Sequence, residues 1–173
     1  MKNFFILSAV GKDRPGLVNK ITHAINQLGG NIELQRSSRM ASEFAMLVLF
    51  STGENRPDLF DRIRELNSDS LHVNVRSAIS GTSEKLEAAH YLHLTASGAD
   101  QPGIVDAVTM VLFKESINIE SMDYDTESAP MSGEHLFRLK ARLMLPDDLD
   151  IGLLRSRLRE LEEEYNFDIL LEP

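Results

Sequence analysis

The octapeptide GKDRPGLV at residues 11–18 returns in the same chain as GADQPGIV at residues 98–105, with five of eight positions identical. The triplet Asn-Ile-Glu at 31–33 recurs at 118–120 with the same offset of 87 residues and without a gap. Because the chain has 173 residues, each copy belongs to one half of it. An internal repeat with this period predicts that each half is one structural unit.

The segment between the halves, ISGTSEKLEAA at 79–89, has the small and polar residues of a linker. We therefore expect domains at 1–78 and 90–173. Domains of this size bury only about 60–65% of the surface that their unfolded chains expose, so they gain stability by packing together or by dimerising. The sequence thus predicts two small domains and a homo-oligomer, with a dimer expected.

Hydrophobic periods of two and of 3.6 alternate in the same order in both halves. The first half predicts strand, helix, strand, strand, helix, strand over residues 3–10, 17–28, 31–40, 43–51, 59–66 and 71–77. The second half predicts the same order over residues 90–97, 104–112, 117–125, 134–145, 151–161 and 166–172. Its hairpin connection, TESAPMSGE at 126–134, is the longer of the two.

Each half is thus predicted to be a ferredoxin-like βαββαβ unit of the α+β class. Right-handed crossovers place both helices on one face of a four-stranded antiparallel sheet. On the third strand of the first half, apolar residues stand at successive positions, so both faces of that strand are apolar. The residues on the face without helices are Ala45, Leu47 and Leu49. We expect that face to be covered.

The repeated G-x-D-x-P-G stretch falls where the first strand ends and the first helix begins. An aspartate suits the capping of helix N–H groups, a proline suits the first helical turn, and a glycine leaves the helix start without a Cβ. An anion such as a carboxylate could then approach the backbone closely. The alternative is that the stretch has a structural role alone, as a tight strand–helix turn that binds no ligand. The residues concerned are Asp13, Pro15, Gly16, Asp100, Pro102 and Gly103.

Asn31 and Asn118 stand at the start of the strand that follows the first helix of each half. That strand start lies away from the glycine turn of its own unit, so it could face a ligand held across an interface with another domain. The alternative is a left-handed turn residue after Gly29-Gly30. Gln101 replaces Arg14 in the second copy, so the two turns need not bind alike. An arginine there could add a charge-assisted contact to a carboxylate.

GKDRPGLV…NIE and GADQPGIV…NIE, carried on βαββαβ halves, resemble tandem ACT domains, the amino-acid-sensing regulatory modules. The layout of two such units resembles the glycine cleavage repressor family, whose first domain is similar to SAVGKDRPGLVNKIT followed by GGNIELQRSSRMASEFAMLVLF. The resemblance implies that a small, glycine-like amino acid binds at ACT–ACT interfaces near the turn. It also implies that the protein acts on a LysR-type activator rather than on DNA.

The candidate ligand-binding residues are those of the two turns and the two strand starts. They are Asp13, Arg14, Pro15, Gly16, Leu17, Asn31, Ile32, Asp100, Gln101, Pro102, Gly103, Ile104, Asn118 and Ile119.

Composition argues against several other classes of function. The chain has 18 Lys and Arg against 27 Asp and Glu, and this net charge of −9 disfavours direct binding of nucleic acid. It has no Cys, so thiolate metal sites, disulfides and a cysteine nucleophile are excluded. His90 and His93 are three apart on a predicted strand and point to opposite faces, so they cannot share a metal.

The sequence contains no phosphate-binding loop and no nucleophile elbow. We therefore expect a protein that is not an enzyme and that needs no cofactor or metal. The apolar start is too short for a secretory signal, and no segment approaches the roughly 20 apolar residues of a membrane span. A cytoplasmic location is expected. Two alternatives to an amino-acid-responsive regulator stay open, namely a ligand-independent ACT interaction module and an effector subunit of a biosynthetic enzyme.

Overall fold

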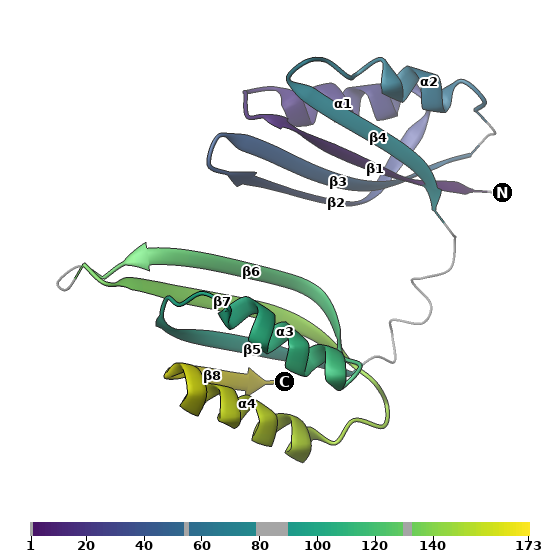
Figure 1. The fold of residues 1–173 in the computed structure, drawn as a ribbon. Coiled ribbons are helices and arrows are strands. Elements are labelled where there is room, and N and C mark those ends of the chain that lie inside the picture. Colours follow the sequence, from purple (N-terminus) through teal and green to yellow (C-terminus); the bar gives the residue numbers. More distant parts are fainter. Residues whose placement is uncertain (1, 54–55, 79–89, 130–132) are drawn as a thin grey trace. The chain divides into compact units, whose positions relative to one another are not determined.

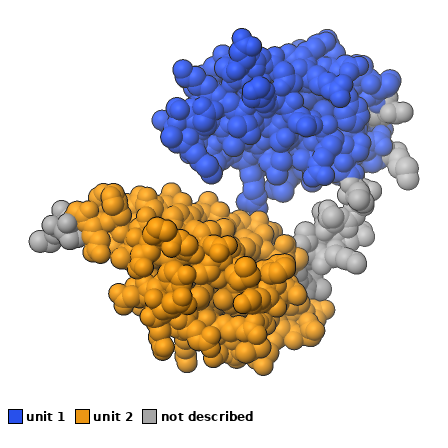
Figure 2. Space-filling model, in the orientation of Figure 1, with its two compact units in different colours: residues 1–82 blue, residues 83–173 orange. Residues whose placement is uncertain are grey.

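The computed structural model describes residues 2–53, 56–78, 90–129 and 133–173. The chain divides into two compact units, Met1–Thr82 (unit 1) and Ser83–Pro173 (unit 2), coloured separately in Figure 2. The expected linker, 79–89, and part of the long hairpin connection, 130–132, lie outside the described residues. Each unit is described by itself below.

Unit 1 has the βαββαβ order that the periodicity predicts (Figure 1). Its strands form one antiparallel sheet in the order β2-β3-β1-β4, and both helices lie on one face of it. The elements are β1 (Asn3–Lys12), α1 (Leu17–Gln27), β2 (Gly30–Met40), β3 (Glu43–Thr52), α2 (Leu59–Arg64) and β4 (Leu71–Ala78).

Unit 2 repeats this architecture, with the strand order β6-β7-β5-β8. The elements are β5 (His90–Ala99), α3 (Ile104–Lys114), β6 (Asn118–Ser128), β7 (His135–Leu145), α4 (Ile151–Tyr165) and β8 (Phe167–Glu172). The prediction of two ferredoxin-like units of the α+β class is confirmed. None of the described helices combines the length and the apolar character needed to cross a bilayer.

The core of unit 1 lies between its helices and its sheet. On β1, Leu7 and Ala9 point to the helix side and are fully buried. On α1, the buried residues are Leu17, Ile21 and Ile25, whose spacing of four keeps them on one helical face. This burial holds α1 against the sheet, and it thereby positions the turn that leads into the helix.

The second helix of unit 1 is shorter than the apolar pattern predicts, because it ends at Arg64. The N–H groups of Leu66 and Asn67 donate to carbonyls three residues earlier, at 3.1 and 3.0 Å, which tightens the chain into a 3₁₀-type turn. The Asn67 side chain then accepts from the N–H of Val73 at 2.8 Å and donates to its carbonyl at 3.0 Å. These bonds turn the chain into β4 before another helical turn can form.

The sheet faces that carry no helix differ between the units. In unit 1 this face is apolar in its centre, and Val10 and Leu47 each leave 51% of their surface exposed there. In unit 2 the same register positions hold Ser97 and Lys140. The apolar character from which a covered face was predicted is therefore a property of unit 1.

Candidate ligand-binding site

The first turn of the repeat, residues 13–16, leads from β1 into α1 (Figure 1). The Asp13 N–H donates to the Ser42 carbonyl at 2.8 Å, which ties the turn to the β2–β3 hairpin. Gly16 is the N-cap of α1, and its carbonyl accepts from the Lys20 N–H at 2.8 Å. The N–H groups between Gly16 and Lys20 precede this first helical bond, so they can donate to an anion.

The geometry corrects two expectations about the turn. No side chain caps α1 or α3, because the cap position is held by the glycine and not by Asp13 or Asp100. The prolines, Pro15 and Pro102, precede the helices instead of occupying their first turns.

The glycine is required for its backbone conformation. Gly16 has a φ of 89° and Gly103 a φ of 97°, in the left-handed region that other residues rarely adopt. A Cβ added at Gly16 would meet no atom within 4 Å. The left-handed backbone, and not a lack of space, therefore explains the glycine at this position.

The second turn, residues 100–103, is tied to the rest of unit 2 by side chains. The Tyr124 hydroxyl, from β6, donates to an Asp100 carboxylate oxygen at 2.5 Å. The Gln101 amide donates to the Tyr165 carbonyl at 3.0 Å, and the Tyr165 hydroxyl lies 3.9 Å from where a Cβ of Gly103 would stand. Burial, followed by the hydrogen bond and charge of Asp100, raises the pKa of Tyr124 to about 12. Tyr124 therefore stays a hydrogen-bond donor at neutral pH.

The first turn is more open. The Asp13 carboxylate forms an ion pair with Arg39 of β2, with Nε and Oδ2 3.4 Å apart, and both side chains remain in contact with solvent. Arg14, which occupies the position of Gln101, is exposed and makes no hydrogen bond or ion pair to any residue that the structure describes. The two copies of the turn thus share a backbone and differ in their side-chain contacts.

Two open hollows meet along the exposed side of α1. One, of about 560 Å³, is lined by the residues of the turn together with Asn19, Thr22 and Phe44. The other, of about 430 Å³, is lined by Asn19 and Thr22 again and by residues that include Asn31 and Ile32 at the start of β2. The shared lining residues, Asn19 and Thr22, join the predicted turn residues of unit 1 to its predicted strand-start residues along the exposed side of α1.

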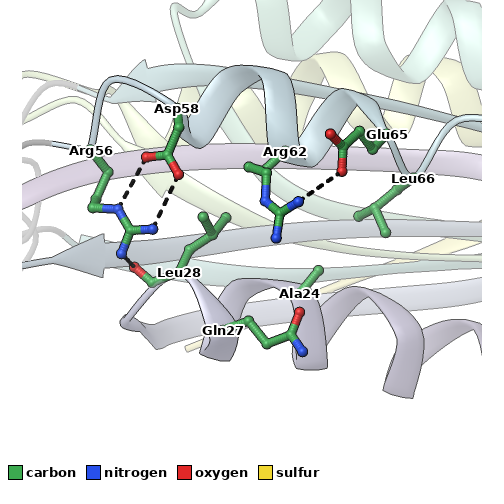
Figure 3. Close-up of a pocket in the computed structure, with 8 residues that line it drawn as sticks. All are labelled: Ala24, Gln27, Leu28, Arg56, Asp58, Arg62, Glu65 and Leu66. Atoms are coloured by element: carbon green, nitrogen blue, oxygen red, sulfur yellow. Dashed lines mark hydrogen bonds and ion pairs between the residues drawn. The ribbon is translucent and has the colours of Figure 1, made fainter.

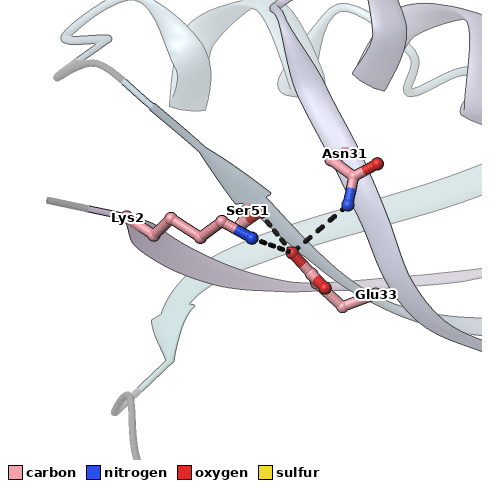
Figure 4. A network of polar contacts seen from close by, with 4 residues as sticks. All are labelled: Lys2, Asn31, Glu33 and Ser51. Atoms are coloured by element: carbon pink, nitrogen blue, oxygen red, sulfur yellow. Dashed lines mark hydrogen bonds and ion pairs between the residues drawn. The ribbon is translucent and has the colours of Figure 1, made fainter.

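Asn31 belongs to a polar network that is centred on Glu33 (Figure 4). One carboxylate oxygen of Glu33 accepts from Ser51 at 2.6 Å, from Lys2 at 3.2 Å and from the Asn31 amide at 3.3 Å. The hydrogen bonds from Ser51, Asn31 and Lys2 hold the pKa of Glu33 below its ordinary value. Asn31 has no left-handed φ, so the alternative interpretation of a turn residue is wrong.

Glu33 lies in a β-bulge, since the β2–β3 register shifts between Ile32 and Leu34. Unit 2 has the same shift between Ile119 and Ser121, which places Glu120 in the equivalent bulge. The Glu120 carboxylate contacts Arg142 at 2.7 Å, and the Arg142 guanidinium lies 4.1 Å from the Tyr91 ring centroid. The sequence analysis did not select these glutamates, although each is the third residue of the repeated Asn-Ile-Glu triplet.

A further hollow of about 460 Å³ lies between α1 and α2 (Figure 3). Its charged groups pair with one another. Arg56 donates to both carboxylate oxygens of Asp58 at 3.1 and 3.2 Å, and Arg62 donates to Glu65 at 3.3 Å. Both pairs lie within residues 56–65, and Arg56 also donates to the Leu28 carbonyl at 3.4 Å, which joins this segment to the end of α1. Within the described residues, no three potential metal ligands gather at one point.

Comparison with known proteins identifies the protein family of the first unit. The ACT domain family matches residues 3–75, and unit 2 has the same topology and the same turn. Residues 3–75 thus belong to the ACT domain family, and unit 2 repeats the same ferredoxin-like fold, so that the chain has the architecture of tandem ACT domains.

Similarity to one relative extends over nearly the whole chain. The glycine cleavage system transcriptional repressor of Escherichia coli is 22% identical over 165 residues, which cover 95% of this chain and 87% of that protein. The crystal structure of an unknown protein from Galdieria sulphuraria superposes with a TM-score of 0.86 at 30% identity, covering 99% of this chain and 98% of that one. A crystal structure assigned to a glycine cleavage system transcriptional repressor gives 0.68 at 18% identity, with 99% and 97% covered.

Proposed function

We propose that the protein is an amino-acid-responsive regulator and that its ligand, a small glycine-like amino acid, binds at the turn of unit 1. The observation that carries this proposal is the difference between the two turns. In unit 1 the exposed Arg14 has no partner among the described residues, and the turn lines an open hollow of about 560 Å³. In unit 2 the side chains of Asp100 and Gln101 are already engaged.

The groups at the first turn match the two charges of an amino acid. The ligand carboxylate would accept from the N–H groups at the start of α1 and from the guanidinium of Arg14. The ligand ammonium would face the Asp13 carboxylate, whose side chain remains 34% exposed beside Arg39. Because the hollow is open, we propose that another ACT domain covers the bound ligand, which would then lie at an interface.

The affinity of such a site has an upper limit. Glycine has five non-hydrogen atoms, and a ceiling of about −1.5 kcal/mol per atom allows about −7.5 kcal/mol. This limit corresponds to a dissociation constant of a few micromolar. A site that binds more weakly than this ceiling has an affinity that suits metabolite sensing.

We further propose that the output passes through a protein partner, in the cytoplasm. The net charge of −9 opposes binding to a phosphate backbone. The related Escherichia coli protein is named as a transcriptional repressor, and a LysR-type activator is the partner that the family resemblance implies. Capture of such an activator from a lysate, dependent on the amino acid, would support this route. Capture of a biosynthetic enzyme would instead favour an effector subunit.

The decisive test is isothermal titration calorimetry of the full chain with each of the twenty amino acids, paired with thermal unfolding. We expect one small amino acid to bind once per chain, and saturation at 100 times the dissociation constant to add about 2.7 kcal/mol to the free energy of unfolding. Arg14→Gln, which installs the residue type of the second turn, should weaken binding by roughly tenfold or more, because it removes the charged contact.

A matched control is Arg155→Gln, which removes another exposed arginine from α4 in unit 2. This variant should bind as the wild type does. A stoichiometry of two, or equal losses in both variants, would contradict the placement of the site in unit 1. No binding of any amino acid would refute the sensor and leave the ligand-independent interaction module.

A further inference from the structure

The helix-free face of the unit 1 sheet carries a continuous group of apolar side chains. It is formed by most of the alternate residues of the two central strands and reaches Leu34 on β2, and the same face also carries the polar residues Ser8, Arg36 and Ser38. Leu34, Leu47 and Val10 expose 54%, 51% and 51% of their surface, and Met40 at the end of β2 exposes 70%. We call this surface the unit 1 apolar face; its members are Phe4, Ile6, Val10, Leu34, Met40, Ala45, Leu47 and Leu49.

Unit 2 provides an internal control for this surface. Gly11 pairs with Phe44 in unit 1 and Gly98 pairs with Phe137 in unit 2, so the two sheets can be aligned residue by residue. At the positions of Ala45, Leu47 and Leu49, β7 of unit 2 carries three cations. These are Arg138, Lys140 and Arg142.

The other strands of unit 2 differ from those of unit 1 in the same way. The positions that are apolar on β1 and β2 of unit 1 hold mostly polar or charged residues on β5 and β6, among them His93, Ser97, Ser121 and Glu127. The same fold therefore forms with a charged face. Apolar residues on the unit 1 face are not needed for folding, and so they require another explanation.

The whole helix-free face, apolar centre and polar margin together, approaches the size of a protein interface once its protruding side chains are counted. Four strands about 4.8 Å apart, with about ten residues each at about 3.3 Å per residue, span roughly 19 by 33 Å, or about 600 Å² before side-chain relief is counted. A stable interface removes about 800 Å² of accessible surface from each partner. The apolar centre lies on β1 and β3, while His72, Asn74 and Arg76 of β4 form a polar margin. An apolar centre with a polar rim is the usual anatomy of an interface.

We propose that the unit 1 apolar face is the interface of a two-fold homodimer, with the same face of a second copy as its occupant. Most of these apolar residues lie on the two middle strands. A two-fold axis through the middle of the face therefore packs the apolar centre of one copy against the apolar centre of the other, with the polar margins at the edge of the interface. Each chain has one such face, since the matching face of unit 2 is charged. A single self-complementary face closes the assembly at two chains instead of extending it.

The test is sedimentation equilibrium of the full chain across micromolar concentrations. We expect the wild type to have twice the chain mass of 19.4 kDa. In Leu47→Lys, each chain places a cation at the centre of the interface, so association should weaken on the order of a hundredfold. Lysine stands at the matching position of unit 2, so the sheet accommodates it, and circular dichroism should report an unchanged fold.

Phe113→Lys serves as the matched control, because Phe113 on α3 is the most exposed of the described large apolar residues, at 77%. It should leave the mass at two chains. A wild-type monomer at all concentrations, or a dimer that Leu47→Lys leaves intact, would overturn the proposal. Calorimetric titration of the Leu47→Lys variant with the amino acid is the second readout, because a monomer that still binds the ligand separates a failure of this interface from a failure of the proposed function.

Discussion

At the scale of single residues, two aspartates in the same repeated turn have different partners. Asp13 pairs with the exposed Arg39, whereas Asp100 accepts a hydrogen bond from Tyr124. An exposed ion pair contributes little to stability, in the range of about 0–1 kcal/mol, while a hydrogen bond to a charged group contributes about 1.5–3 kcal/mol. The aspartate therefore contributes more to stability in unit 2 than in unit 1, where its side chain stays partly exposed.

Tyr124→Phe is expected to lower the free energy of unfolding of unit 2 by about 1–2 kcal/mol at neutral pH, because it removes the donor to Asp100. The folded-state pKa of Tyr124 is raised to about 12, so this stabilisation is full below the unfolded value of about 10 and is lost as the pH rises toward 12. Denaturant unfolding at neutral and alkaline pH measures both effects. An equal deficit for the variant throughout this range would contradict the linkage.

Glu33→Gln should lower the melting temperature at neutral pH and have less effect at acidic pH. The pKa of Glu33 is depressed by Ser51, Asn31 and Lys2, so its contribution is present above the unfolded value of about 4.3 and is lost as the pH falls through the folded-state pKa. Thermal unfolding from neutral to acidic pH gives the difference directly. Glu43→Gln, at an exposed position for which no hydrogen bond is described, is the control and should show no such trend.

At the scale of elements, the position of the turn depends on how closely β1 approaches the chain that leads into β4. A Cβ at Gly11 would stand 2.2 Å from the Ser70 carbonyl oxygen and 2.8 Å from the Leu71 Cα. Real Cβ atoms do not approach backbone this closely, so the strand would have to move. Gly11 precedes the 13–16 turn by two residues, and a shift there also displaces the start of α1.

Gly11→Ala is therefore expected to destabilise unit 1 by roughly 1–3 kcal/mol and to weaken ligand binding at the turn. Gly53→Ala is the matched control, because a Cβ at Gly53 would have no atom of the described residues within 4 Å. Chemical denaturation and calorimetric titration of both variants make the comparison. Equal free energies of unfolding for the two variants would contradict this prediction, because β1 would then move without any loss of stability.

At the scale of the whole molecule, the chain contains two hydrophobic cores that share no residue. One is centred on residues such as Phe50 and Ile21 in unit 1, and the other on residues such as Phe137 and Leu112 in unit 2. Each core is enclosed by its own sheet and helices. Duplication therefore produced two units that can diverge, and their helix-free faces and their turns have diverged.

We expect a change in one core to leave the other unit intact. Ile21→Ala should cost unit 1 about 2–5 kcal/mol, because it removes a fully buried side chain from its core. Hydrogen exchange followed by mass spectrometry should show lost protection in unit 1 peptides and unchanged protection in β5 and β7. Loss of protection in both units together would show that they unfold as one.

The sequence by itself determined the architecture, because the features that define it are local. Hydrophobic periods mark each element, and the duplicated turn marks where each unit begins, so the order βαββαβ followed without any knowledge of contacts. The charge and the absence of cysteine also narrowed the classes of function from composition alone. The positive φ of Gly16 came from the structure, whereas the sequence predicted only that a glycine leaves the helix start without a Cβ.

Only the tertiary structure decided how the two turns differ. Tyr124 lies 24 residues from Asp100, and Tyr165 lies 64 residues from Gln101, so neither contact leaves a trace in the local pattern. The Glu33 network likewise depends on strand pairing that brings Ser51 and Lys2 to a bulge. Register and packing determine which side chains contact one another, and these contacts decide which side chains of each turn are hydrogen-bonded and which stay exposed.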